Sequence, residues 1–423
     1  MSLADTPLRE KVNFVIFGGT GSLSRKKLLP AIYELSRKRK INLNKVFLLG
    51  RKEEKFEEIQ NSFPEGFRKF LKFVKFSVER EESFRLLALE EGLTVFYLAL
   101  PPSLFKKALE GIGKYLNVKN KRIVVEKPFG LDLKSAKELN EVISRYFSEE
   151  EIFRIDHFLG KPQVQNILSF KFSNFLFDEL LSSKFVDKVE VLALEEEGVE
   201  GREAYYEEVG VLKDMVQNHI LMLCTLISMD APPSLEELVR ERERTLRFFR
   251  KLSQEEVLKF FRKGRYREYK GRAETYAEGV FFVDNARWTG VPFFFKTGKK
   301  LGEKRTEVRI LFKEVPKAYQ SLFVCKPNKN ILTFKLFPEL SVELTVNLIS
   351  PFGFLACSER KVWKIDLKEI LSDVPSPYES LLLAVIEGDK RFFVGKEEVI
   401  LLWEVVEPIL KVWDKVEEFV YGN

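Results

Sequence analysis

The fold of this 423-residue chain is indicated most directly by residues 12–29, which read VNFVIFGGTGSLSRKKLL. The segment begins with a short run of β-forming residues, passes through a glycine turn, and continues with leucines at helical spacing. This order is typical of the first βαβ unit of a dinucleotide-binding sheet, because the turn and the helix N-terminus together attract a pyrophosphate. The spacing is G-G-x-G rather than the full G-x-G-x-x-G, so a tight turn without a ligand stays open as the alternative. The candidate cofactor contacts in this turn are Gly18, Gly19, Thr20, Gly21, Ser22 and Leu23.

The alternation of strands and helices continues through the first third of the chain. Further strands are predicted over residues 46–49, 93–100 and 122–126, with helices over 103–115 and 133–146. Such alternation predicts an open parallel sheet with right-handed crossovers. We therefore expect an α/β, Rossmann-like, doubly wound cofactor-binding domain over residues 1–155.

The pattern changes after residue 155. Little helix separates the later β-rich runs, which favours an antiparallel sheet with helices, an α+β domain over residues 156–423. The predicted strands cover residues 188–195, 277–284, 292–296, 307–312, 330–337 and 341–348. The predicted helices cover residues 164–176, 212–229, 378–387 and 396–421.

Composition excludes several protein classes. A hydrophobic fraction of 45% is ample for a packed core, and the 32% of charged residues, rich in Lys, Glu and Arg, favours a heat-stable protein. Cys224, Cys325 and Cys357 are widely spaced without a CxxC pair, so neither a disulfide framework nor a zinc site is indicated. No apolar run approaches the ~20 residues needed to cross a bilayer. We expect a cytoplasmic protein with no membrane partner and no metal.

One stretch is strongly basic. Residues 240–272 hold 13 basic and 5 acidic side chains, a net charge of +8 in a chain whose total is +6. A basic stripe can bind nucleic acid. Interleaved glutamates favour a solvated helical face instead, so we expect no nucleic-acid partner.

Histidine is scarce, and both copies lie near an aspartate. Asp156 directly precedes His157, and Asp214 lies five residues before His219. On an α-helix five residues span about 500° of turn, which puts Asp214 and His219 on different faces and favours Asp156 as the carboxylate partner of His219. A histidine paired with a carboxylate is a good general base for an alcohol.

Basic residues near predicted strand ends are candidate ligand contacts. Arg51 follows the second strand, where an arginine accommodates the 2′-phosphate of NADP, although a surface arginine stays open as the alternative. Lys127 follows the fourth strand, at the edge where parallel sheets bind ligands, and a cis bond to Pro128 would fix its direction. Further candidates for gripping an anionic group are Lys161, Lys299 and Lys304.

Several longer segments carry a distinctive pattern: VIFGGTGSLSRKKLLPAIYEL (15–35), IVVEKPFG (123–130), RIDHFLGK (154–161), GVLKDMVQNHILML (210–223) and DNARWTGVPFFFKTGKKL (284–301). Over essentially the whole chain, these segments resemble the glucose-6-phosphate dehydrogenase family. The resemblance implies oxidation of the C1 hydroxyl of β-D-glucose 6-phosphate to 6-phosphogluconolactone, the first step of the oxidative pentose phosphate pathway. The hydride acceptor would be NADP, or also NAD as in some members. A homodimer or tetramer, built through the large sheet of the second domain, is also implied.

The resemblance also assigns roles to individual residues. His219 matches the general base and Asp156 its partner, while Lys127 matches a lysine near the reacting carbon and the cofactor. The remaining matches are phosphate ligands (His157 and Lys161), groups that bind sugar hydroxyls (Glu195 and Asp214), a substrate lysine (Lys299), a basic position (Lys304) and the arginine at the 2′-phosphate (Arg51).

Some positions depart from the family pattern. Phe158 replaces a common Tyr, which removes one phosphate contact, and Arg51 follows Gly50 without the usual one or two intervening residues. Lys296 stands where an Arg helps to hold a second, structural NADP in some animal enzymes, so no second site is expected here.

Two other functions are weighed against this one. Another NAD(P)-linked sugar or sugar-phosphate oxidoreductase would share the sheet and the E-K-P motif, but the basic trio of His157, Lys161 and Lys304 argues against a neutral sugar. An NADPH-sensing or nucleic-acid-binding protein without catalysis would not need both histidine clusters.

Overall fold

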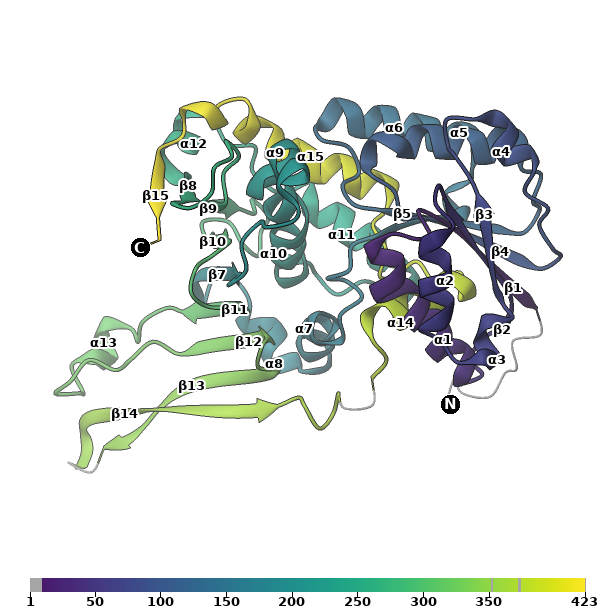
Figure 1. Ribbon diagram of the computed structural model, residues 1–423. Coiled ribbons are helices and arrows are strands. Elements are labelled where there is room, and N and C mark those ends of the chain that lie inside the picture. Colours follow the sequence, from purple (N-terminus) through teal and green to yellow (C-terminus); the bar gives the residue numbers. More distant parts are fainter. Residues whose placement is uncertain (1–9, 351–352, 372–373, 423) are drawn as a thin grey trace. The chain divides into compact units, whose positions relative to one another are not determined.

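A computed structural model describes residues 10–350, 353–371 and 374–422 (Figure 1). The chain divides into two compact units. The first contains residues 1–161 and 375–400, and the second contains residues 162–374 and 401–423. The expected division at residue 155 did not include the return of residues 375–400 to the first unit.

The first unit is built on a six-stranded parallel sheet with the order β3-β2-β1-β4-β5-β6. Its strands are β1 (Lys11–Phe17), β2 (Asn42–Gly50), β3 (Leu71–Lys75), β4 (Leu93–Leu98), β5 (Lys121–Glu126) and β6 (Ile152–Ile155). The expected Rossmann-like sheet is therefore confirmed. Sequence patterns missed β3 and β6, which are short strands at the two edges of the sheet.

Helices cover both faces of this sheet because successive strand residues point to opposite sides. Phe14 and Ile16 of β1 join one buried cluster with α1 (Leu29–Arg37) and α14 (Pro377–Glu387). Val15 and Phe17 join another with α5 (Phe105–Tyr115) and α6 (Leu133–Tyr146). The shorter helical segments of the unit are η1 (Ser24–Leu28), α2 (Glu54–Asn61), α3 (Glu65–Arg68), α4 (Glu81–Arg85), η2 (Pro102–Leu104) and η3 (Glu149–Glu151).

The second unit is built on a sheet that has nine strands within the described residues, in the order β14-β13-β12-β11-β7-β10-β9-β8-β15. The sheet is mixed, since the pairs β7–β10 and β8–β15 are parallel and the other pairs are antiparallel. Its strands are β7 (Val186–Leu194), β8 (Arg262–Tyr266), β9 (Tyr276–Phe282), β10 (Pro292–Gly298), β11 (Arg305–Phe312), β12 (Ile331–Phe337), β13 (Ser341–Ser350), β14 (Gly353–Asp366) and β15 (Glu418–Tyr421).

The helices of the second unit precede the sheet strands or lie between them. They are α7 (Pro162–Ser173), α8 (Phe175–Leu180), α9 (Glu203–Val211), η4 (Leu212–Ile220), α10 (Leu221–Ser228), η5 (Leu235–Glu237), α11 (Leu238–Leu246), α12 (Gln254–Phe260), α13 (Lys317–Gln320) and η6 (Trp413–Lys415). The expected helix over 396–421 is wrong at its end, because α15 (Lys396–Leu410) stops early and residues 418–421 pair with β8 as a strand. The strand that pairs with residues 418–421 lies more than 150 residues earlier in the chain, so the sequence around these residues gives no sign of the pairing.

The basic stretch of residues 240–272 is extensively ion-paired. Arg250 pairs with Asp284, Lys251 with Glu404 and Arg262 with Glu417, and Arg265 pairs with Glu418. The acidic partners come from other parts of the second unit and neutralise much of the basic charge. This favours a solvated surface rather than a stripe that binds nucleic acid.

The cysteines differ from expectation at one position. Cys224 is a buried free thiol, whereas Cys325 is disulfide-bonded. The expectation of no disulfide is therefore wrong, and a wide spacing along the chain did not exclude a bridge. In the described part of the chain, no helix combines the length and the apolar character that crossing a membrane requires.

Candidate active site

The glycine turn lies where three parallel strands crowd together. Gly18 has φ +76°, and a Cβ there would collide with the Ala99 carbonyl beyond β4. A Cβ on Gly19 would lie 2.6 Å from Leu48 Cα of β2. The backbone can therefore approach closely only with glycine at both positions. The turn leads into the helix formed by η1 and α1, so helical N–H groups start at the turn, as a pyrophosphate site requires.

Arg51 lies next to this turn. A Cβ on Gly50, the last residue of β2, would lie 3.0 Å from the Thr20 hydroxyl, which places the end of β2 against the turn. Arg51 follows directly and its side chain is exposed. The position suits contact with the adenosine ribose of a dinucleotide, so these residues fit a nicotinamide dinucleotide cofactor.

The ends of β5 and β6 bring two expected site residues together. Glu126 is paired in register with Ile155, so the residues that follow, Lys127 and Asp156, are neighbours at the carboxyl edge of the sheet. The Lys127–Pro128 bond is cis. Asp156 is buried, and its Oδ1 accepts a hydrogen bond of 2.9 Å from the Phe158 N–H.

Glu126 itself is held by two phenols, and sequence reasoning missed it. The Tyr97 hydroxyl donates to Glu126 Oε1, and the Tyr378 hydroxyl of α14 donates to the same oxygen at 3.5 Å. Burial raises the pKa of Glu126 from 4.5 to about 7, against the lowering effect of the two phenols and of Lys127. The only local signal was its place before Lys127 in the E-K-P motif.

Phe158 packs between two expected phosphate ligands. The His157 and Phe158 rings meet edge to face at 5.3 Å, and Lys161 Nζ lies 3.6 Å from the centre of the Phe158 ring. A cation over an aromatic face is attracted electrostatically. At the position where the family commonly has Tyr, this chain therefore has a ring that contacts both basic side chains.

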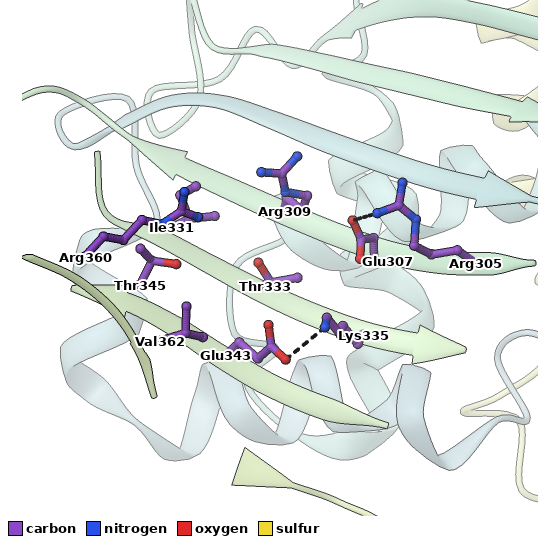
Figure 2. Close-up of a pocket in the computed structure, with 10 residues that line it drawn as sticks. All are labelled: Arg305, Glu307, Arg309, Ile331, Thr333, Lys335, Glu343, Thr345, Arg360 and Val362. Atoms are coloured by element: carbon purple, nitrogen blue, oxygen red, sulfur yellow. Dashed lines mark hydrogen bonds and ion pairs between the residues drawn. The ribbon is translucent and has the colours of Figure 1, made fainter. Parts of the chain in front are cut away.

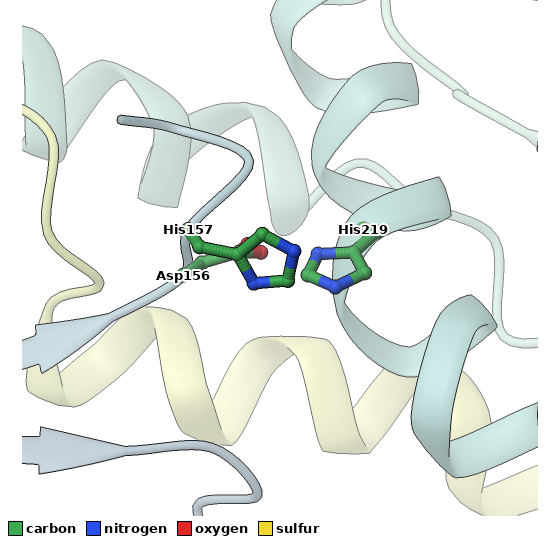
Figure 3. A group of neighbouring side chains, drawn as sticks. All are labelled: Asp156, His157 and His219. Carbon is green, nitrogen blue, oxygen red and sulfur yellow. The ribbon is translucent and has the colours of Figure 1, made fainter. Parts of the chain in front are cut away.

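The helix that carries Asp214 and His219 is π-helical over η4. Figure 3 shows His219 on this helix, and Asp156 and His157 on the segment after β6. In a π-helix hydrogen bonds run between residues five apart, so residues five apart fall about one turn from each other. The expectation that Asp214 and His219 lie on different faces assumed an α-helix and is wrong. The choice of Asp156 as the partner of His219 thus rests on the family resemblance.

Glu195 and Lys299 form an ion pair in the second unit. They follow β7 and β10, whose last residues Leu194 and Gly298 pair in parallel register. The Tyr421 hydroxyl donates a hydrogen bond of 2.7 Å to the Lys299 backbone carbonyl. In α9, the Tyr205 hydroxyl donates to Asp214 Oδ1 at 3.3 Å. Both pairs offer donors and acceptors that could hydrogen-bond the hydroxyls of a polar ligand.

Lys304 forms an ion pair with Glu197 in the same unit. Its Nζ lies 2.7 Å from Glu197 Oε1, and the side chain is 42% exposed. A phosphate ligand at this lysine would have to compete with the Glu197 carboxylate, which is itself 65% exposed and free to turn away.

A separate hollow lies on the large sheet and holds charges of both signs. Figure 2 shows Arg305 paired with Glu307 and Lys335 paired with Glu343. The N–O distances of these pairs are 3.2 Å and 3.0 Å. Arg309 pairs with Glu190 at 2.9 Å. The lining also includes Arg360, so cations outnumber carboxylates, but Glu307 and Glu343 keep the hollow from presenting charges of a single sign.

Comparison with known families covers nearly the whole chain. Residues 15–166 match the NAD binding domain of glucose-6-phosphate dehydrogenase, and residues 168–423 match its C-terminal domain. The chain belongs to the glucose-6-phosphate dehydrogenase family.

Individual members of the family support this assignment along the full length. The chain is 33% identical to glucose-6-phosphate 1-dehydrogenase of Borreliella burgdorferi, with 97% of this chain and 94% of the relative aligned. A solved glucose-6-phosphate dehydrogenase in complex with its substrate glucose-6-phosphate is 28% identical, with a TM-score of 0.87 over 99% of this chain and 96% of that one. Glucose-6-phosphate 1-dehydrogenase from Mycobacterium avium gives a TM-score of 0.83 at 26% identity, over 98% and 94% of the two chains.

In this member of the glucose-6-phosphate dehydrogenase family, the expected site residues form two groups, one in each unit. The first unit holds the glycine turn and Arg51 beside it, and Lys127 and Asp156 at neighbouring strand ends. The second unit holds the pair of Glu195 and Lys299. Sequence reasoning missed Glu126, Tyr97, Tyr378, Tyr205 and Tyr206, because the hydrogen-bond partners of a tyrosine or glutamate are unknown until its neighbours in the fold are known.

Proposed function

We propose that this chain oxidises the C1 hydroxyl of β-D-glucose 6-phosphate to 6-phosphogluconolactone and passes the hydride to NADP. The observation that carries the proposal is family membership over both units, with the two histidine clusters retained. A fold without the family's residues would not support it, since one fold hosts many chemistries.

The residues at the first sheet edge support NADP as the acceptor. The helical N–H groups after the turn would bind the pyrophosphate, and Arg51 would bind the 2′-phosphate. When bound, the nicotinamide ring accepts a hydride. Use of NAD as well is an outcome that the assay below decides.

The proposed chemistry divides among three kinds of group. His219 removes the proton of the C1 hydroxyl, while Asp156 orients the ring and stabilises the imidazolium that forms. Lys127 lies near the reacting carbon and the cofactor. The phosphate ligands are His157, Lys161 and Lys304, and the sugar hydroxyls bind to Glu195, Asp214 and Lys299. Binding energy from the distant phosphate would position C1 for reaction.

The deciding experiment follows nicotinamide reduction by absorbance with purified protein. Four pairings are compared, of NADP or NAD with glucose 6-phosphate or glucose. We expect rapid turnover with NADP and the phosphorylated sugar, and a loss of several orders of magnitude in kcat/KM with glucose, because the anionic anchor is gone. Turnover with NAD alone would keep the reaction and remove the role of Arg51. Equal rates with glucose would favour a different sugar oxidoreductase.

We also propose a homodimer or tetramer built through the large sheet, in the cytoplasm. Exposed apolar side chains on β13 and β14 support an oligomer, since Ile349, Trp363 and Ile365 are 70%, 60% and 55% exposed. Patches of this kind commonly mark protein interfaces. Light scattering coupled to size exclusion tests the proposal, and a mass near 49.4 kDa would contradict it.

A further inference from the structure

Tyr206 of α9 has a buried hydroxyl that finds no hydrogen-bond partner in the described part of the chain. The residue is 1% exposed, and among the described residues its hydroxyl makes no hydrogen bond. Burying a hydroxyl without a hydrogen bond is costly, so such groups are rare in folded proteins. An orphaned group of this kind needs an explanation, and a ligand that supplies the missing bond is one.

The surroundings of Tyr206 are those of a binding site. Lys299 Nζ lies 5.7 Å from the centre of the Tyr206 ring. Burial raises the pKa of the Tyr206 phenol well above 10, and the nearby carboxylates of Asp214, Glu274 and Glu195 raise it further. The hydroxyl therefore keeps its proton at every working pH and stays available as a donor.

The neighbouring tyrosine shows the contrast. The Tyr205 hydroxyl already donates to Asp214 Oδ1 at 3.3 Å, while the Tyr206 hydroxyl has no such bond. Between this tyrosine pair and Asp214, the chain turns sharply at Gly210, which has φ +62° and lies against the Glu274 carboxylate. The turn places Tyr206 of α9 among the same acidic and basic groups as Asp214 of η4.

We propose that the Tyr206 hydroxyl is a further substrate-binding group, which hydrogen-bonds a ring hydroxyl of the sugar held by Glu195, Asp214 and Lys299. The inference deepens the proposed function and rests on it. It predicts that loss of the Tyr206 hydroxyl affects the stability of the free protein and the binding of substrate in opposite directions. Removing the hydroxyl removes an unpaired buried group from the free protein, but it also removes a bond from the complex.

The test is the variant Tyr206→Phe, which deletes one oxygen and keeps the ring. We expect its unfolding midpoint to equal or exceed that of the wild type, and its kcat/KM for glucose 6-phosphate to fall about tenfold, mainly through KM. The matched control is Tyr276→Phe. Tyr276 is also buried, but its hydroxyl donates to Glu278 at 2.6 Å, so this variant should lose stability and keep kcat/KM.

Substrate analogues separate a direct bond from an indirect effect. The wild type and Tyr206→Phe are compared on 2-deoxy, 3-deoxy and 4-deoxy glucose 6-phosphates. A direct bond predicts that the tenfold gap disappears for the one analogue that lacks the bound hydroxyl and persists for the other two.

Three outcomes would overturn the inference. Unchanged kcat/KM in Tyr206→Phe would show that the hydroxyl makes no bond to the substrate. A difference in kcat/KM between wild type and variant that persists with every analogue would show that the effect is indirect. A clear loss of stability in Tyr206→Phe would show that the hydroxyl has a partner in the free protein, such as a bound water. A wild type that does not turn over glucose 6-phosphate would refute the proposed function itself. An active wild type with an equally active Tyr206→Phe variant would refute only the role of Tyr206.

Discussion

The Glu126 carboxylate links the end of β5 to a segment that returns from much later in the chain. Tyr97 of β4 and Tyr378 of α14 both donate to its Oε1. Lys127 and Asp156 act on it as nearby charges of opposite sign. A proton at Glu126 therefore changes the field at two residues proposed for the active site.

The first prediction concerns the pH dependence of stability at Glu126. Because its folded-state pKa is raised to about 7 from 4.5, the folded protein holds a proton in this window that the unfolded chain releases. The free energy of unfolding therefore falls as pH rises from 4.5 to 7. Glu126→Gln keeps an acceptor for both phenols and cannot ionise. We expect the variant to gain on the order of 2 kcal/mol relative to the wild type between pH 5 and pH 8.

Urea unfolding at pH 5 and pH 8 measures this difference. The control is Glu57→Gln, at an exposed position of α2, which should follow the wild type at both pH values. An identical pH response in the wild type and Glu126→Gln would refute the prediction.

The second prediction separates the two histidines. His219→Asn should lower kcat by about 10² to 10⁴, the usual range for loss of a general base, with little change in KM. His157→Asn should mainly raise KM for glucose 6-phosphate, because a phosphate ligand contributes to binding. Steady-state kinetics of both variants provide the measurement. Near-normal turnover in His219→Asn would sink the assignment of the base.

At the scale of elements, the π-helix η4 changes which residues share a face. Its nine residues, Leu212–Ile220, include both Asp214 and His219. Periodicity in the sequence predicted a helix there, and this is confirmed. The wider turn could not be predicted, because apolar spacing over nine residues does not separate α from π geometry and π-helices are rare.

The third prediction concerns Gly210, at the break between α9 and η4. Its φ of +62° and ψ of 177° lie in a region that is essentially restricted to glycine, and a Cβ would collide with the Glu274 carboxylate. We expect Gly210→Ala to lower the free energy of unfolding by roughly 2–4 kcal/mol, from backbone strain plus the collision. Its kcat/KM should also fall, since Tyr206 and Asp214 lie on either side of the break.

Gly290→Ala is the matched control for Gly210→Ala. Gly290 also has a positive φ, +84°, but an added Cβ there meets no atom within 4 Å. We expect this control to cost about 1 kcal/mol, the strain of the backbone alone. Chemical denaturation of both variants measures the difference, and equal losses would mean that Glu274 turns aside without cost.

At the scale of the whole molecule, the first unit is completed by residues 375–400. Leu381, Leu382 and Val385 of α14 are almost fully buried in the same cluster as Phe14 of β1. Lys38 also pairs with Glu379 of α14 at 2.8 Å. The sheet of the first unit would therefore expose a large apolar face without this helix.

The fourth prediction follows from this return. A fragment of residues 1–161 should fail to fold cooperatively, because its apolar face lacks α14. Joining residues 375–400 to it through a flexible glycine–serine linker should restore a cooperative thermal transition and binding of NADP. Circular dichroism and calorimetry of the two fragments give the measurement. A fragment of residues 1–161 that folds as well as the fused one would contradict the prediction.

Local sequence determined the elements that a short segment specifies by itself. The run of residues 12–17 and the leucines after the glycine turn predicted β1 and the first helix, because a strand of apolar residues and a helical stripe each leave their own period. Alternation of strands and helices then predicted the parallel sheet. The candidates in the turn and at Arg51 and Lys127 followed from their positions at predicted strand ends, where a parallel sheet gathers them at one edge. Asp156 was a candidate because it lies beside one of the two histidines, since the strand before it was not predicted.

Only the tertiary structure decided the features that depend on distant neighbours. The pairing of β15 with β8 and the return of α14 join residues far apart in the chain, and no local period records such contacts. The raised pKa of Glu126 and the unpaired hydroxyl of Tyr206 likewise arise from burial and from charges on other elements. A side chain's type is written in the sequence, but its desolvation and its partners exist only once the chain has folded.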